Sequence, residues 1–180
     1  MKTLSKITLG ILFLASTVAF ANNNDPIKKS NDDDPTIVGV AASNENFSTL
    51  VAAVKAADLV ATLNSEGPFT VFAPTNEAFS KLPAGTVETL LKAENKGMLT
   101  SILTYHVVAG KFEAADVLKA IKDNGGKFAI TTVNGEKLTA HIMDGKVMLQ
   151  DAKGNSSTII LTDVGASNGV IHAIDTVVMP

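Results

Sequence analysis

The sequence of 180 residues contains no cysteine, no tryptophan and no arginine, and it contains one tyrosine. The lack of cysteine excludes disulfide bonds, thiol nucleophiles and thiolate metal sites. Fifteen basic residues, all of them lysine, face 18 acidic residues, so the formal charge is -3. A weakly acidic chain without guanidinium groups is a poor match for a phosphate backbone, and nucleic acid is therefore not an expected partner. The length allows one ordinary domain with appendages and excludes a large multidomain enzyme.

The first 21 residues have the pattern of a secretory signal peptide. Lys2 and Lys6 precede an uncharged apolar run over residues 7–20, which closes on the small residues Ala19 and Ala21. A basic start, a short apolar centre and an A-x-A end are typical of a cleaved signal. The run is shorter than the roughly 20 residues needed to span a bilayer, and a lipid anchor on cysteine is not available. We therefore expect an exported protein, periplasmic or extracellular, without a membrane anchor.

Residues 22–35 predict a flexible polar leader, and residues 36–180 predict one domain. The leader is charged and nearly free of apolar residues, so it cannot bury enough surface to offset the entropy of ordering. Its three adjacent aspartates, residues 32–34, lack the spaced ligands and the turn glycine of a calcium loop. From residue 36 onward the apolar pattern is dense, with no second linker and no internal repeat.

The first half of this domain has mainly helical patterns. Apolar residues recur at helical spacing over residues 43–63, and shorter helices are predicted over 86–92, 96–103 and 113–122. A short apolar strand is predicted over residues 69–73, ended by Pro74. Thr75 then suits the N-cap of a helix that runs to residue 82, because its hydroxyl can accept hydrogen bonds from helix amides. We expect the segment Pro74-Thr75-Asn76 to be structural.

The second half has the alternating pattern of β-strands. Strands are predicted over residues 128–132, 138–142, 147–149, 157–161 and 170–179. Asn134-Gly135 and Asp144-Gly145 are typical hairpin turns. A helix-rich half followed by an antiparallel strand-rich half indicates an α+β fold.

Three segments, in this order, resemble a fasciclin domain. They are residues 70–79 (TVFAPTNEAF), residues 105–108 (YHVV) and residues 168–175 (NGVIHAID). The resemblance covers residues 36–180, and the last segment closes the chain as it closes such domains. It implies a fasciclin-like fold, a wedge-shaped antiparallel β-sandwich with several short α-helices packed around it.

The resemblance also implies an extracellular interaction and adhesion module, not an enzyme. In animal members of the family, a Tyr-His pair and an Asp-Ile pair before the last block take part in integrin binding. Here the pairs are Tyr105-His106 and Asp163-Val164, and Gly165 follows where a larger apolar residue is usual. The four residues are the expected interaction surface. The expected partner is a protein or a cell-surface or matrix component.

Other chemistry has little support in the sequence. Only His106, His141 and His172 could be imidazole ligands of a metal. His141 should point to the solvent face of its strand, and His172 and Asp175 should lie on opposite faces because they are three residues apart. There is no G-x-S-x-G motif and no phosphate-binding loop. No metal site, cofactor or catalytic residue is therefore expected.

One alternative function stays open, a soluble binding protein for a small ligand or a glycan. Sugar-binding surfaces favour tryptophan and tyrosine faces, and the sequence has no tryptophan and a single tyrosine. The sequence leaves the oligomeric state and the identity of the partner open.

Overall fold

A computed structural model describes residues 35–180, and the predicted signal peptide and residues 22–34 of the predicted leader lie outside the described residues. The helices are α1 (Ile37–Ala42), η1 (Glu45–Phe47), α2 (Ser48–Ala56), α3 (Val60–Leu63), α4 (Asn76–Ser80), α5 (Thr86–Leu90), η2 (Ala93–Asn95), α6 (Lys96–Tyr105) and α7 (Ala114–Asp123). The strands are β1 (Phe69–Pro74), β2 (Val107–Ala109), β3 (Lys127–Thr131), β4 (Lys137–Met143), β5 (Lys146–Gln150), β6 (Ser156–Ala166) and β7 (Gly169–Ile174). In the part of the chain described, no helix has both the length and the apolar character to cross a membrane.

The seven strands form one sheet in the order β2-β1-β7-β6-β5-β4-β3. The N–H of Val133, just after β3, donates to the carbonyl of Val107 in β2 at 2.7 Å, so the sheet is nearly closed. Five neighbouring pairs are antiparallel, and β1 pairs with β7 in parallel. The predicted α+β class is confirmed. The parallel pair arises because β1 and β7 are separated by most of the domain, which supplies the long crossover that parallel strands require.

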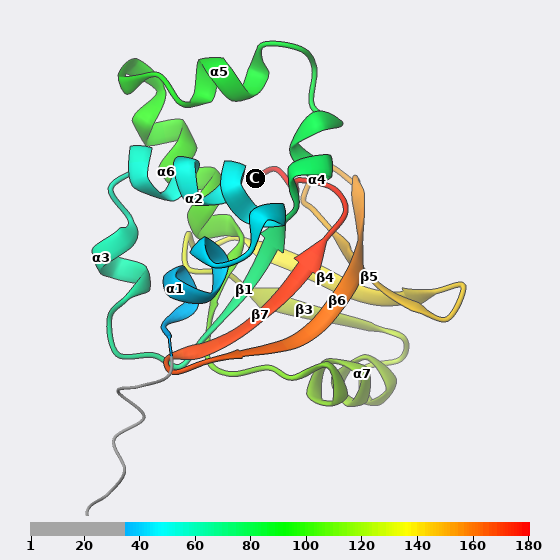
Figure 1. The fold of residues 1–180 in the computed structure, drawn as a ribbon. Coiled ribbons are helices and arrows are strands. Elements are labelled where there is room, and N and C mark those ends of the chain that lie inside the picture. Colours follow the sequence, from blue (N-terminus) through cyan, green and yellow to red (C-terminus); the bar gives the residue numbers. More distant parts are fainter. Residues whose placement is uncertain (1–34) are drawn as a thin grey trace, which may run out of the picture. The chain divides into compact units, whose positions relative to one another are not determined.

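Two apolar cores flank the sheet. In the first, α1, α2 and α6 pack against β1 and β7, with Phe47, Leu50 and Ile171 buried. In the second, α7 packs against the sheet, with Tyr105 and Ile121 among its buried members. Figure 1 shows α1, α2, α3 and α6 gathered on one side of β1 and β7, and α7 apart from them.

Helix boundaries differ from the sequence expectation mainly at the start. The single helical stretch predicted over residues 43–63 is divided into η1, α2 and α3. Asn44 caps η1 by accepting from the N–H of Asn46 at 3.0 Å, and Asp58, with φ of 61°, ends the run after α2. The predicted cap at Thr75 is confirmed, since its Oγ1 accepts from the N–H of Ala78 at 3.3 Å.

Strand boundaries follow the turn residues. Asp144 and Gly145 both have positive φ, 52° and 74°, and form the predicted two-residue turn between β4 and β5. Asn134-Gly135 lies in a longer loop, in which the N–H of Thr132 donates to the carbonyl of Glu136 at 2.9 Å. The strand β6 is longer than predicted. Its pairing with β7 is irregular between Ile159 and Val164, and this irregular stretch carries two of the predicted site residues.

Candidate functional site

The irregular part of β6 exposes apolar side chains. We call residues 160–164 the β6 bulge. Ile160 and Leu161 are 53% and 48% exposed, Asp163 is exposed and Val164 is half-buried. Asp163 has φ of 58°, in the left-handed region, where aspartate is tolerated better than most residues. Leu161 and Val164 still pair with β7, but the register shifts on both sides of Leu161, and the bulge presents two exposed aliphatic side chains close in sequence to an exposed aspartate.

Hydrogen bonds from Asp163 and His172 hold this bulge in place. The N–H of Asp163 donates to Nδ1 of buried His172 at 3.2 Å. Nε2 of His172 lies 2.8 Å from the carbonyl of Phe112, and since Nδ1 accepts, the ring proton is on Nε2 and donates there. The Oδ1 of Asp163 accepts from the N–H of Ala114 at 2.8 Å, so the carboxylate caps the first turn of α7. The bulge is thus fixed to the segment that leads into α7.

Tyr105 lies in the interior at the end of α6. It is 0% exposed, and burial raises the pKa of its hydroxyl. The hydroxyl donates to the carbonyl of Lys137 in β4 at 3.0 Å and accepts from the N–H of Ala152 at 3.2 Å. Tyr105 therefore links α6 to β4 and to the segment after β5.

His106 is buried next to it and is neutral. Its Nδ1 is 2.8 Å from the carbonyl of Ile102, and its Nε2 accepts from the N–H of Val178 at 3.3 Å. Accepting at Nε2 places the proton on Nδ1, which donates to Ile102. Burial lowers the pKa of this imidazole from 6.5 to about 4. The ring thereby ties α6 to the C-terminal segment without carrying charge.

The structure does not bring the four predicted site residues into one surface. Tyr105 and His106 are inside the fold, whereas Asp163 and Val164 lie in the β6 bulge. The expectation of a common exposed surface is corrected, because Tyr105 and His106 each use their polar atoms in buried hydrogen bonds across the fold. A partner on the native surface reaches neither side chain. Any role of these two residues in binding is indirect, and the role of all four stays a prediction.

The remaining histidine and aspartate candidates are dispersed. Within residues 35–180 no three metal-ligating side chains gather at one point. Asp175 accepts from the N–H of Thr158 at 2.8 Å and forms an ion pair with Lys81 at 3.3 Å, away from the bonds that His172 makes. His141 is half-buried, on the face of β4 opposite the buried Ala140, as the alternation predicted.

Two asparagines of the signature segments connect distant parts of the fold. Oδ1 of Asn76 accepts from the N–H of Thr49 at 3.0 Å, and its Nδ2 donates to the carbonyl of Glu45 at 2.8 Å. Oδ1 of Asn168 accepts from the N–H of Ile37 at 2.9 Å, and its Nδ2 donates to the carbonyl of Leu63 at 2.7 Å. The structural interpretation of Pro74-Thr75-Asn76 agrees with this geometry. The long-range partners are a feature that the sequence did not reveal.

Gly169, which follows Asn168, has a steric requirement of its own. A Cβ at this position would overlap the carbonyl oxygen of Phe69, where β7 runs parallel to β1. In the last signature segment, Asn168 therefore holds the start of α1, and Gly169 allows β7 to lie close to β1.

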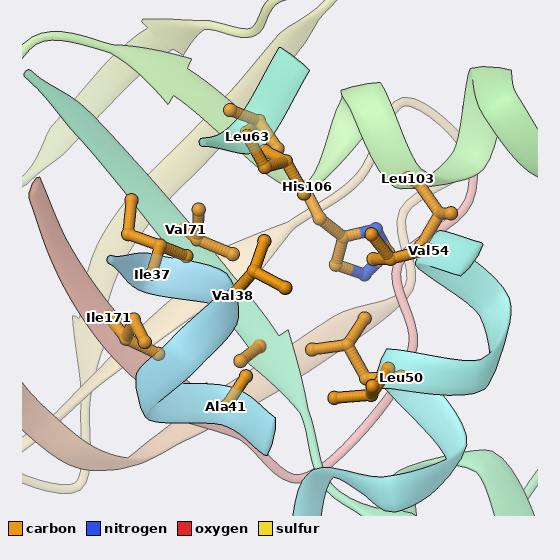
Figure 2. Close-up of a pocket in the computed structure, with 13 residues that line it drawn as sticks. Ile37, Val38, Ala41, Leu50, Val54, Leu63, Val71, Leu103, His106 and Ile171 are labelled. Atoms are coloured by element: carbon orange, nitrogen blue, oxygen red, sulfur yellow. The ribbon is translucent and has the colours of Figure 1, made fainter. Parts of the chain in front are cut away.

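An apolar cavity of about 30 Å³ lies beneath α1, between α1, α2, α6 and β1. Figure 2 shows the side chains of Ile37, Val38 and Ala41 on one side of it and the ring of His106 on another. Every lining residue except His106 is aliphatic. Sequence reasoning missed this site. The only signal was the apolar spacing of residues 37, 38 and 41, which was not assigned to a helix.

Comparison with known proteins gives consistent matches. The fasciclin domain profile matches residues 45–180. Protein sll1483 of Synechocystis sp. is 59% identical over 145 residues, which are 81% of this chain and 73% of that protein. Immunogenic protein MPT70 of Mycobacterium tuberculosis is 36% identical over 167 residues, covering 90% of this chain and 78% of that protein. Transforming growth factor-beta-induced protein ig-h3 of Sus scrofa is 37% identical over 81% of this chain, but only 19% of that protein is matched.

A solved structure shows the same fold. The FAS1 domain pair from the insect cell adhesion molecule Fasciclin I aligns with a TM-score of 0.71 at 21% sequence identity, over 81% of this chain and 51% of that one. The strand order, the short helices around the sheet, the profile match and these relatives agree. The chain belongs to the fasciclin-domain family.

Proposed function

We propose that this protein is exported to the periplasm or the extracellular space and binds a protein, or another cell-surface or matrix component, through the β6 bulge. The observation that carries the proposal is the exposure of Ile160 and Leu161 beside Asp163. Two adjacent aliphatic side chains that stay half exposed in a folded domain are the kind of surface that a partner covers. The apolar run and A-x-A end of residues 1–21 support export.

The rigidity of the bulge favours binding. Hydrogen bonds fasten Asp163 to His172 and to the start of α7, so little loop ordering is needed when a partner docks. Tyr105 and His106 contribute indirectly in this proposal, by holding α6 against the sheet and the C-terminal segment.

The names of two similar proteins also support a role at a cell surface. Fasciclin I is described as an insect cell adhesion molecule. A cell surface glycolipoprotein, MPB83 of Mycobacterium bovis, is 37% identical over 80% of this chain. These descriptions concern those proteins, and for this chain they support a role at a cell surface.

The test is a pull-down in which residues 22–180, or a variant of them, capture components from the native envelope and from the extracellular fraction. The amounts retained by the parent and by each variant are then compared. Leu161→Ser removes apolar contact area without touching a core. Met98→Ser is the matched control, since Met98 is 60% exposed on α6. We expect Leu161→Ser to reduce retention of the captured component by at least about tenfold, and Met98→Ser to leave it unchanged. Equal retention by both variants, with equal melting temperatures, would contradict the proposal.

A second comparison isolates the charge of Asp163. Asp163→Asn keeps an oxygen that can accept from the N–H of Ala114, whereas Asp163→Ala loses this bond. A partner that recognises the carboxylate should bind both variants weakly. A partner that needs only the bulge conformation should bind the Asn variant like the parent.

The alternative, a binding protein for a small ligand or a glycan, has one observation in its favour, the cavity beneath α1. Its aliphatic walls favour an apolar molecule over a sugar, because a buried sugar hydroxyl requires hydrogen-bond partners.

A further inference from the structure

We propose that the cavity beneath α1 is a binding site for an uncharged apolar small molecule, an alkyl chain or a comparable hydrocarbon group, which enters between α1 and α2. The site is separate from the β6 bulge and does not depend on the function proposed for that surface. Figure 2 shows its walls, with Val71 of β1 and Ile171 of β7 beside the side chains of α1.

The chemistry of the walls selects the ligand class. The lining is aliphatic except for His106, and both nitrogens of that ring already have protein partners, Ile102 and Val178. No donor or acceptor of this side chain is left for a ligand. A polar molecule would lose its hydrogen bonds to water and gain none from these side chains, which makes its binding free energy less favourable. A hydrocarbon has no such hydrogen bonds to lose. An apolar void of this kind also stays dry, so a hydrocarbon has no bound water to displace.

The size of the cavity requires α1 to move. A cavity of about 30 Å³ has room for only a few small groups, so it accepts only a small part of an alkyl chain. Val38 on α1 and Val51 on α2 line the cavity and are only half-buried, which marks the side where it approaches solvent. A longer chain fits when these two helices separate at that side.

The attachment of α1 permits this separation. The hydrogen bonds that fasten α1 to distant segments lie at its N-terminal end, from the N–H of Ile37 to Asn168 at 2.9 Å and from Thr36 Oγ1 to Asn64 at 2.6 Å. The carbonyl of Pro35, just before α1, accepts a hydrogen bond from the N–H of Ser167 at 3.1 Å. The body of the helix meets α2 through aliphatic packing at the cavity. The other end of this six-residue helix continues through Ser43 and Asn44 into η1, so a tilt of α1 away from α2 keeps these bonds and bends the chain at those two residues.

The test uses N-phenyl-1-naphthylamine, an uncharged fluorescent apolar probe, with 1-dodecanol as competitor, on residues 22–180. We expect saturable fluorescence enhancement that dodecanol reverses. Ala41→Leu fills the cavity from α1 and should weaken probe binding by at least about tenfold. Ala42→Leu adds the same groups to the exposed neighbour on the same helix and should leave binding unchanged.

Two further measurements distinguish filling of the cavity from misfolding of a variant. Ala73→Val fills the cavity from β1, so it should weaken binding as Ala41→Leu does, and the melting temperature of each variant shows whether it is folded. In the unmodified protein, dodecanol should shift backbone amide resonances in α1 and α2 and leave those of β4 and β5 in place. The proposal is overturned if the parent gives no saturable binding, if a folded cavity-filling variant binds like the parent, or if the shifted amides lie elsewhere.

Discussion

Acidification should weaken the fold through His106. Burial lowers the pKa of this imidazole from 6.5 to about 4, whereas in the unfolded chain the ring regains its ordinary value. Between these two pKa values the unfolded state binds a proton that the folded state does not. The stability contributed by the neutral ring is therefore fully present above about pH 6.5 and is lost as the pH falls toward 4.

The magnitude follows from the two pKa values. Each pKa unit of difference corresponds to ~1.36 kcal/mol, so the free energy of unfolding should fall by ~2 kcal/mol between about pH 7.5 and about pH 5. The carboxylate of Asp175 affects stability in a different, more acidic pH range. Burial alone would raise the pKa of Asp175, but hydrogen bonds from Thr158, Thr176 and Lys81 outweigh it and lower the pKa below 3.8. The stability from Asp175 is thus present above that value and is lost only at lower pH.

The assay is urea unfolding of residues 22–180, followed by far-ultraviolet circular dichroism at several pH values across that window. His106→Gln removes the titrating ring, so this variant should be less stable than the parent at neutral pH and should lose most of the pH dependence. His141→Gln, which changes a half-buried histidine on β4, is the control and should keep the slope of the parent. A parent that loses less than about 0.5 kcal/mol across the window, or a His106→Gln variant with an unchanged slope, would refute the reasoning.

Two other substitutions test the hydrogen bonds that join distant segments. Tyr105→Phe leaves the N–H of Ala152 without its partner and should lower the free energy of unfolding by ~1–3 kcal/mol in urea titrations, and an unchanged midpoint would contradict the role assigned to the hydroxyl. Asn76→Ala removes the bonds to Thr49 and Glu45 and should cost ~1–3 kcal/mol by the same assay. Asn76→Asp retains an acceptor for Thr49 and should recover part of that loss, so equal losses in both variants would contradict the assignment.

The sequence predicted helix caps and tight turns correctly, because these features depend on interactions between residues close together in the chain. Thr75 reaches the amide of Ala78, three residues on, and this cap was visible in the sequence because the interaction is local. The turn at Asp144-Gly145 was predictable for the same reason, since both residues tolerate positive φ. The three signature segments carried the family resemblance, which the profile match over residues 45–180 confirmed.

Helix division at the start of the domain was harder to predict. Apolar spacing over residues 43–63 continues through the breaks, because α2 and α3 bury their apolar sides in the same core. The positive φ of Asp58, which separates them, is not required by its residue type. The cavity was missed with α1, whose six residues form too short a pattern for reliable recognition.

Composition and motif order predicted the α+β class and the family correctly, because both depend on local residue preferences and on short sequence motifs. The placement of the candidate site residues was decided only by the folded chain. Tyr105 and His106 are inside because Lys137, Ala152 and Val178, which are 32 to 72 residues away, close over them. Burial depends on what long-range packing brings to a residue, and the neighbouring sequence does not contain that information.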